Sequence, residues 1–335
     1  MLSKHHFLFF LLALCSSWVL PILAAETTVQ VTLGNSIQKA IDSLPADGSS
    51  AIIEIESGVY HENITISRPN IIFRPSTEGQ VVLEQSVRDY AVVFIEAPGT
   101  DISFYNVDII NTIGEAAGNQ NALRTYGERL AMYNCKLVGF GDTAFFVRGS
   151  GYLYNSWVEG TVDYFYGEYN LYVYKSTVAC SGQGAVTAAS TLLDNPAGGF
   201  VFNKANFTPV VSSIYDKRQE NDHSYTDPLS PEEYESSVIL GRPWHNGPRV
   251  IIVQSNIMSH IKPKGYDAWN FSEEELENNV YYAEYANTGP GADTSGRVSW
   301  SRQISEKEAA PYLSPQTYFN NLDLGTDWID PEYLE

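Results

Sequence analysis

The chain has few cysteines, which limits the ways in which it can be stabilised. Of its 335 residues three are cysteines, and Cys15 lies in an N-terminal segment that we expect to be removed. Cys135 and Cys180 remain, and either one disulfide or two buried free thiols would account for them. A small domain held together by several disulfides is therefore excluded. With 44% hydrophobic residues, the chain can instead build a sizeable core.

Positive charge is also scarce. The sequence has 20 Lys and Arg residues against 40 Asp and Glu residues, a formal net charge of −20. Loss of Lys4 with the leader would leave 19 basic residues and a net charge of −21. Nucleic acid and anionic membrane surfaces are therefore poor partners, because both would repel such a chain.

Long hydrophobic runs are missing after the first 25 residues. The start contains the apolar block "FLFFLLAL" and small residues at Ala24 and Ala25, which is typical of a secretory signal peptide over residues 1–25. We expect a mature chain from about Glu26 that is secreted to the extracellular space or cell wall and has no membrane attachment after cleavage. The sequons at Asn63, Asn206 and Asn270 suit a secreted glycoprotein.

A repeated pattern predicts the fold. Short segments share an apolar residue, an aromatic and a polar residue, followed by alternation: "FYNVDI", "MYNCKL", "LYNSWV", "VYKSTV" and "VFNKAN". Their aromatics are Tyr105, Tyr133, Tyr154, Tyr174 and Phe202, spaced 28, 21, 20 and 28 residues apart. Strand-rich repeats of this length predict an all-β, single-stranded right-handed parallel β-helix, with a two-sheet sandwich as the alternative.

The start of the mature chain differs from these repeats. Residues 35–45, "NSIQKAIDSLP", have apolar positions at helical spacing and predict a helix that caps the N-terminal end of the β-helix. Residues 182–238 contain Pro- and acid-rich stretches such as "TDPLSPEEYESS", which predict long loops beside the coils. No linker divides the chain, so residues 26–335 are expected to form one domain.

Two aspartates occupy the same position in successive repeats. Asp142 and Asp163 each follow the repeat tyrosine, Tyr133 or Tyr154, by nine residues. Because adjacent strands are about 4.8 Å apart, this register predicts two carboxylates side by side. A solvated turn aspartate is the simpler explanation for either one alone. Two at one register favour a catalytic pair, suited to ester or glycoside hydrolysis.

Six segments in a fixed order add a family resemblance. They are "GVYHE" (58–62), "NTIGEAAGNQNALR" (111–124), "GDT" (141–143), "GTVDYFYG" (160–167), "LGRPW" (240–244) and "EYANTGPGADTSGRVSW" (284–300). Together they resemble the pectin methylesterases, or pectinesterases, carbohydrate esterases on a right-handed β-helix. The resemblance runs from about Ser36 to Trp300. It implies a monomeric hydrolase that acts on methyl-esterified homogalacturonan, the backbone of pectin.

The resemblance also implies residue roles. Asp163 corresponds to the nucleophile that attacks the ester carbonyl, and Asp142 to the acid that protonates methanol and then activates water. Arg242 corresponds to the arginine that keeps the nucleophile ionised and oriented, which suits a guanidinium beside a carboxylate. The aromatics expected to line the sugar-binding cleft are Trp244, Tyr266, Phe140 and Phe165. No cofactor or metal is implied.

The sequence departs from the family at the expected oxyanion hole. The usual glutamine before Asp-Thr is replaced by Gly141, which has no side chain. An upstream glutamine is replaced by Asn119, with Gln120 one residue later and expected on the other strand face. Asn119 is therefore the candidate donor.

Three functions remain open at this point: a working pectin methylesterase, an altered esterase for another polysaccharide ester, and a noncatalytic polygalacturonan-binding β-helix. The retained Asp142, Asp163 and Arg242 argue against the last. A pectate lyase would need a carboxylate cluster for calcium, and the sequence has none at convincing spacing.

Overall fold

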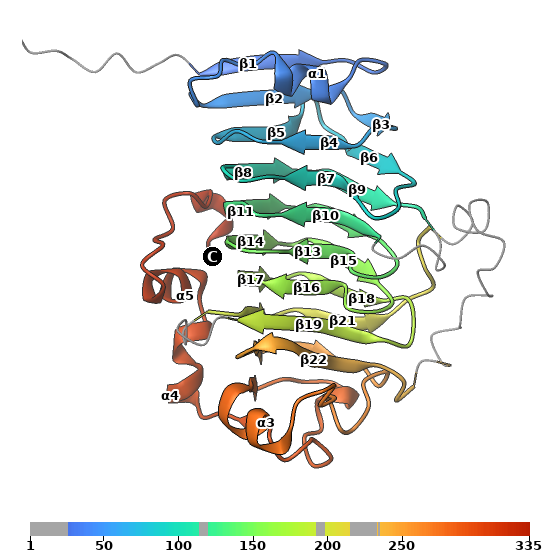
Figure 1. Cartoon of the computed structure of the whole chain (residues 1–335), viewed down its shortest axis with the longest axis vertical. Helices are drawn as coiled ribbons and strands as arrows, with labels where there is room; N and C mark the ends of the chain where they lie inside the picture. The colour runs from blue at the N-terminus through green and yellow to red at the C-terminus, as the bar shows by residue number, and fades with distance from the viewer. Residues whose placement is uncertain (1–25, 114–119, 192–197, 215–232, 234) are drawn as a thin grey trace, which may run out of the picture.

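Parallel strands stacked in coils form the body of the molecule. The computed structural model describes residues 26–113, 120–191, 198–214, 233 and 235–335. Each full coil contributes one strand to each of three parallel sheets, of 11, 8 and 7 strands. The coils follow one another along the long axis, from the N-terminal strands to α3 at the opposite end (Figure 1). The predicted right-handed parallel β-helix is confirmed, and the sandwich alternative is wrong.

The three sheets have the following strands. The 11-stranded sheet contains β1 (Thr27–Val31), β2 (Ala51–Ile55), β5 (Ile71–Pro75), β8 (Thr100–Tyr105), β11 (Glu128–Tyr133), β14 (Ser150–Tyr154), β17 (Asn170–Tyr174), β20 (Phe200–Asn203), β23 (Arg249–Val253), β25 (Tyr281–Tyr285) and β26 (Arg302–Gln303). The 8-stranded sheet contains β3 (Gly58–Tyr60), β6 (Val81–Gln85), β9 (Val107–Asn111), β12 (Lys136–Val138), β15 (Trp157–Gly160), β18 (Thr177–Cys180), β21 (Asn206–Pro209) and β24 (Asn256–Ile257). The 7-stranded sheet contains β4 (Ile64–Ile66), β7 (Ala91–Ile95), β10 (Asn121–Thr125), β13 (Ala144–Phe146), β16 (Phe165–Glu168), β19 (Ala185–Thr191) and β22 (Ile239–Asn246).

A short helix closes the N-terminal end, as the sequence predicts. Helix α1 (Ile37–Asp42) buries Ile37, Ala40 and Ile41 against the first coils. The Ser36 side chain accepts from the N–H of Lys39, which caps the helix. Glu62 of the "GVYHE" segment accepts from the N–H of Ile37 at 2.6 Å, so an acidic group satisfies the helix N-terminus.

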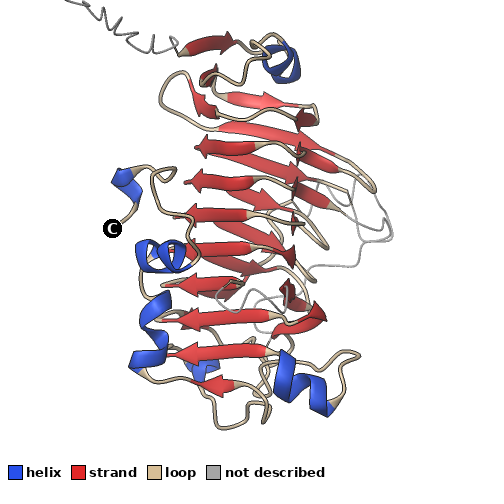
Figure 2. Cartoon of the chain, turned by 60° about the vertical axis from the view of Figure 1, so that its left-hand side comes forward, coloured by secondary structure: helices blue, strands red, loops and turns tan. Residues whose placement is uncertain are grey.

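The C-terminal segment packs along the outside of the 11-stranded sheet. It contains α4 (Glu306–Ala309), η4 (Ala310–Tyr312), α5 (Pro315–Asn321) and η5 (Pro331–Tyr333), after α3 (Glu273–Asn279) and η3 (Pro290–Ala292). The helices beside the strands are visible in Figure 2. Outward tyrosines of the repeats hold this segment: Tyr152 donates to the carbonyl of Tyr333 at 2.6 Å, and Tyr172 to that of Tyr312 at 2.8 Å.

The repeat pattern contains one register error. Residues that alternate with the outward tyrosines, such as Leu130 and Met132, fill the interior. Phe202 also lies in the interior, because Asn203, and not Phe202, is paired with Tyr174. The sequence repeat that equates Phe202 with the tyrosines is therefore one residue out, and a shift of one residue exchanges the two faces of a strand.

The region predicted as long loops contains three strands. Within residues 182–238, β19, β20 and β21 continue the three sheets. Most of the stretch "TDPLSPEEYESS" (226–237) lies outside the described residues. Cys135 and Cys180 are buried free thiols, so of the two possibilities left open by the sequence the disulfide is not formed.

Candidate active site

Asp142 and Asp163 occupy equivalent corners of two successive coils. Each lies between a strand of the 8-stranded sheet and one of the 7-stranded sheet. Gly141 and Val162, the residues before them, form a parallel bridge, and Ala144 pairs with Phe165 after them. Both aspartates have left-handed backbone, with φ of 50° and 51°, a conformation that Asp tolerates better than most residues. The predicted register of the two carboxylates is confirmed.

Arg242 reaches this pair from β22. The 7-stranded sheet pairs it with Ala188 of β19, whose small side chain leaves the space above the sheet open. Its Nε donates to Asp163 Oδ1 at 2.9 Å, and its Nη2 donates to Asp163 Oδ2. This two-point bond fixes the carboxylate plane as well as its charge. The side chains of Arg242 and Asp163 are 22% and 13% exposed, so solvent screens the ion pair only in part.

The two carboxyl groups differ in their electrostatics. Burial and the nearby charge of Asp163 raise the pKa of Asp142 to about 7, against a smaller lowering by Arg242. Burial raises the pKa of Asp163 as well, whereas the hydrogen bonds and charge of Arg242 lower it. Arg242 binds Asp163 and not Asp142. The arrangement therefore favours an ionised Asp163 beside a protonated Asp142.

A pocket of about 160 Å³ opens onto this pair. Its lining residues are Asp142, Asp163, Tyr166, Ala188, Arg242, Pro243, Trp244 and Trp269. The guanidinium carbon of Arg242 lies 3.4 Å from the ring centroid of Trp269, so an aromatic face covers the cation. The rings of Tyr166 and Trp244 are 4.5 Å apart. The pocket thus combines two carboxyls and one guanidinium with aromatic walls.

The sequence-predicted aromatics divide between the pocket and other places. Trp244 lines the pocket. Phe140 is half-buried at the same corner as Asp142, where its carbonyl accepts from the N–H of Thr161 at 2.8 Å, but it does not line this pocket. Phe165 and Tyr266 are completely buried in the core, so neither is placed to line a cleft.

Two aromatics of the pocket are absent from the sequence prediction, Tyr166 and Trp269. Each is a near neighbour of a residue chosen instead. Tyr166 follows Phe165 in the same strand. Because side chains alternate along a strand, Tyr166 points outward and Phe165 points inward. Trp269 stands three residues after Tyr266 and has left-handed backbone with φ of 51°. The alternation of inward and outward residues along the strand could have predicted Tyr166 as a pocket residue. Trp269 lies in an irregular segment, where no such alternation exists.

The candidate oxyanion donors also differ from expectation. Asn119 lies outside the described residues. Gln120, expected on the opposite strand face, is buried, and its Oε1 accepts from the N–H of Gly141 at 2.9 Å. Its amide therefore lies at the corner that precedes Asp142. Gly141 itself has no left-handed backbone, and a Cβ built there would meet Val162 Cγ1 at 3.4 Å, which is ordinary contact.

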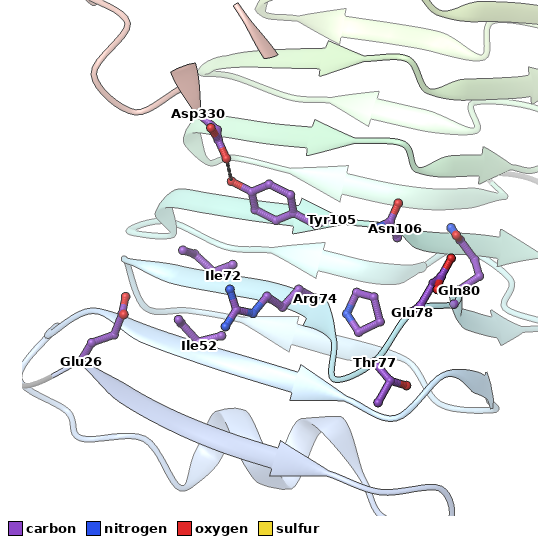
Figure 3. Close-up of a pocket in the computed structure, with 12 residues that line it drawn as sticks. Glu26, Ile52, Ile72, Arg74, Thr77, Glu78, Gln80, Tyr105, Asn106 and Asp330 are labelled. Carbon is purple, nitrogen blue, oxygen red and sulfur yellow. Dashed lines mark hydrogen bonds between the residues drawn. The ribbon is translucent and has the colours of Figure 1, made fainter. Parts of the chain in front are cut away.

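A larger cavity, of about 920 Å³, lies on a different face. Figure 3 shows it over the 11-stranded sheet, where Ile52, Ile72 and Arg74 come from neighbouring strands and Asp330 comes from the C-terminal segment. Arg74 is already paired with Glu54, and Tyr105 donates to Asp330 at 3.0 Å. Its acidic residues, Glu26, Glu78 and Asp330, come from separate segments and are not aligned by strand register as Asp142 and Asp163 are, so the smaller pocket is the candidate active site.

The described residues contain no group of three or more His, Cys, Asp or Glu side chains that could hold a metal ion. No helix among them has both the length and the apolar character required for a membrane span.

Comparisons with known proteins agree on one family. The pectinesterase family model matches residues 23–321. Pectinesterase 31 of Arabidopsis thaliana is 27% identical over 297 residues, which cover 83% of this chain and 86% of that protein. The solved pectin methylesterase from carrot is 25% identical, with a TM-score of 0.75, and the match covers 92% of this chain and 98% of the carrot chain. The Aspergillus niger pectin methylesterase structure is 25% identical, with a TM-score of 0.73 over 91% and 97% of the two chains.

Proposed function

The chain belongs to the pectinesterase family, and we propose that it is a secreted esterase that hydrolyses methyl esters of galacturonate in pectin and releases methanol. The observation that carries this proposal is the pairing of Asp163 with Arg242 beside Asp142 in one small pocket. A carboxylate that is fixed and kept ionised can attack an ester. A second carboxyl with a pKa of about 7 can exchange protons near neutrality.

The first half of the reaction forms a covalent intermediate. An Asp163 carboxylate oxygen attacks the ester carbonyl carbon, and the carbonyl π electrons move to oxygen. When this tetrahedral species collapses, the bond to the methoxy group breaks and Asp142 donates its proton to the departing oxygen. The products of this step are methanol, an anhydride between Asp163 and the galacturonate, and an ionised Asp142.

The second half returns the enzyme to its starting state. Asp142, now a carboxylate, removes a proton from a water molecule, whose oxygen attacks the galacturonate carbonyl carbon of the anhydride. Collapse expels the Asp163 carboxylate, and Arg242 stabilises the returning charge through its two hydrogen bonds. The galacturonate leaves as a free acid, which ionises in solution. Asp142 therefore acts first as an acid and then as a base.

The oxyanion of this reaction needs a hydrogen-bond donor, and the corner before Asp142 offers one. Gln120 is a candidate, because its side-chain amide is fixed there by the N–H of Gly141. Asn119 remains a second candidate from the sequence. One preorganised donor of this kind typically contributes about 10²–10³ in rate.

Secretion is supported by the leader-like first 25 residues and by the sequons. Asn63, Asn206 and Asn270 are all exposed in the structure, as attachment of a glycan requires.

Methanol release from highly methylated pectin by the purified protein tests the proposal. We expect release by the wild type and none above background from Asp163→Asn, with the folded state checked by circular dichroism. Unsaturated products that absorb in the ultraviolet, formed without methanol, would instead identify a lyase and overturn the proposal.

A further inference from the structure

A row of outward side chains leads away from the active site along the 7-stranded sheet. The strand register aligns Phe94 of β7, Arg124 of β10, Phe145 of β13 and Tyr166 of β16, one residue from each successive strand. These four strands are stacked in the same order in Figure 1. Tyr166 lines the active-site pocket. The row, here called the Arg124 ladder, is therefore continuous with the catalytic groups.

Aromatic rings make up most of the Arg124 ladder. Phe145 and Tyr166 are stacked with their ring centroids 4.3 Å apart, and Tyr166 contacts Trp244. At the other end Phe94 packs against Tyr126, which is exposed. Aromatic faces of this kind provide flat contact area for the C–H face of a sugar ring. A pectin chain bound along the ladder would have its acid or ester groups near the one cation in the row.

Arg124 is held within this row without a counter-charge. Its guanidinium carbon lies 5.4 Å from the ring centroid of Phe94 and 5.2 Å from that of Phe145, so it lies between rings of the two flanking strands. Its Nη2 donates to the hydroxyl of Tyr126 at 3.1 Å. No carboxylate among the described residues forms an ion pair with it.

Arg124 lies close enough to the active-site pocket to contact a sugar next to the one that reacts. β10 is two strands from β16, or about 10 Å along the axis at about 4.8 Å per strand. Its charge acts on the hydroxyl of Tyr166 at the pocket. A polymer that crosses the site along the ladder would therefore carry a neighbouring sugar past Arg124.

We propose that Arg124 binds the free carboxylate of a galacturonate that has already lost its methyl ester, one or two sugars from the ester being hydrolysed. The inference rests on the proposed function and names the substrate pattern of that same site. A guanidinium bonds a carboxylate about twice as strongly as a neutral acceptor such as an ester oxygen. Arg124 thereby makes partly demethylated pectin a better substrate than fully methylated pectin.

Substrate preference is the first test. The kcat/KM for methanol release is measured on a fully methylated oligogalacturonate and on one with free carboxylates beside its esters. We expect Arg124→Gln to lower the ratio of the second value to the first by about tenfold or more, as for loss of a hydrogen bond between charged groups. Arg124→Lys keeps the charge without the planar fork, and should retain part of the preference. An unchanged ratio in a folded Arg124→Gln protein would overturn the proposal.

Arg148→Gln is the matched control, because it removes the same charge from an exposed arginine outside the ladder. It should leave the ratio unchanged, and an equal fall in this variant would show a general charge effect and refute a specific site.

Direct binding separates this inference from the proposed function. Trigalacturonate, which carries no ester, is titrated into the wild type and both glutamine variants by calorimetry. We expect Arg124→Gln to weaken binding about tenfold and Arg148→Gln to leave it unchanged. Equal binding to all three proteins would overturn the inference, whatever the activity. Absence of methanol release by a wild type that binds trigalacturonate through Arg124 would overturn the proposed function and leave the carboxylate site standing.

Discussion

The pH dependence of stability should contain two opposing contributions, from His260 and from Asp142. His260 is buried, and its Nε2 lies 3.2 Å from the Sγ of Cys180. Burial lowers its pKa to about 4, although the carbonyl of Met258 acts in the other direction. Burial also raises the pKa of the Cys180 thiol to about 12, so that this partner stays neutral and cannot compensate a protonated imidazole.

The sign of the His260 contribution follows from which state binds more protons. Between pH 6.5 and pH 4 the unfolded chain protonates this histidine and the folded chain does not, so acidification favours unfolding. A shift from 6.5 to about 4 corresponds to roughly 3 kcal/mol at 1.36 kcal/mol per pH unit. This stability is fully present above about pH 6.5, and its loss is complete near pH 4.

Asp142 contributes with the opposite sign. Its pKa rises from 3.8 to about 7 on folding, so the folded chain binds the proton more tightly over that range. Acidification from pH 7 to pH 4 therefore stabilises the folded state by roughly 4 kcal/mol through this group. These two contributions have opposite signs and similar size, so the pH profile of the wild type alone would conceal both.

Two substitutions separate these contributions. Urea unfolding between pH 4 and pH 7 is compared for the wild type, His260→Gln and Asp142→Asn. Relative to the wild type, His260→Gln should gain roughly 3 kcal/mol on acidification over this range, and Asp142→Asn should lose roughly 4. The compared quantity is the change in the free energy of unfolding between pH 4 and pH 7, so a destabilisation that is the same at every pH does not affect the result. His61→Gln, at an exposed histidine, is the matched control and should follow the wild type. Parallel curves for His260→Gln and the wild type would refute the buried neutral imidazole.

Three further predictions concern catalysis. The kcat/KM for methanol release should fall about tenfold per pH unit above about pH 7, because Asp142 must be protonated to act as the acid; a profile still rising at pH 9 would contradict that role. Methanol release should persist in EDTA, since the proposed mechanism uses carboxyls and a guanidinium alone, and loss of activity that calcium restores would count against it. Gly141→Gln should fold, because the backbone there is not left-handed and a Cβ meets only ordinary contacts, and it should raise turnover by adding an oxyanion donor. Unchanged methanol-release kinetics in the folded variant would show that this donor is not limiting.

Much of the fold could be predicted from the sequence because each coil needs the same residue types at the same positions. The polar residue after the repeat tyrosine, Asn106, Asn134 or Asn155, has φ between 46° and 55°, since the chain turns there from the 11-stranded to the 8-stranded sheet. Asparagine tolerates that backbone conformation, so the corner can be recognised in the sequence by an asparagine that recurs after the tyrosine. The predicted register was wrong at Phe202, because this aromatic residue points inward although the sequence pattern aligns it with the outward tyrosines.

The site could be predicted less completely, for a related reason. Asp142, Asp163 and Trp244 stand in short ordered motifs, and the structure brings them together in one pocket. The segment "GYDAW" contains two aromatics, Tyr266 and Trp269, and the sequence does not show which of them is buried. The chain there forms no strand whose alternation would decide it. Packing decides it instead: Tyr266 packs against Tyr282 in the core, and Trp269 covers Arg242 at the surface.

The left-handed corners also determine which substitutions can test the chemistry. Asp142 and Asp163 satisfy a backbone requirement in addition to their proposed role in catalysis, so each aspartate has both a structural and a proposed functional explanation. Replacement by alanine would remove the carboxyl and also place an unsuited residue at positive φ, at a cost of roughly 1–2 kcal/mol. Asparagine keeps the backbone preference and nearly the same shape, and it removes only the charge and the nucleophile. A folded Asp163→Asn protein without activity therefore reports on the reaction, whereas an inactive Asp163→Ala protein would not distinguish lost chemistry from a displaced corner.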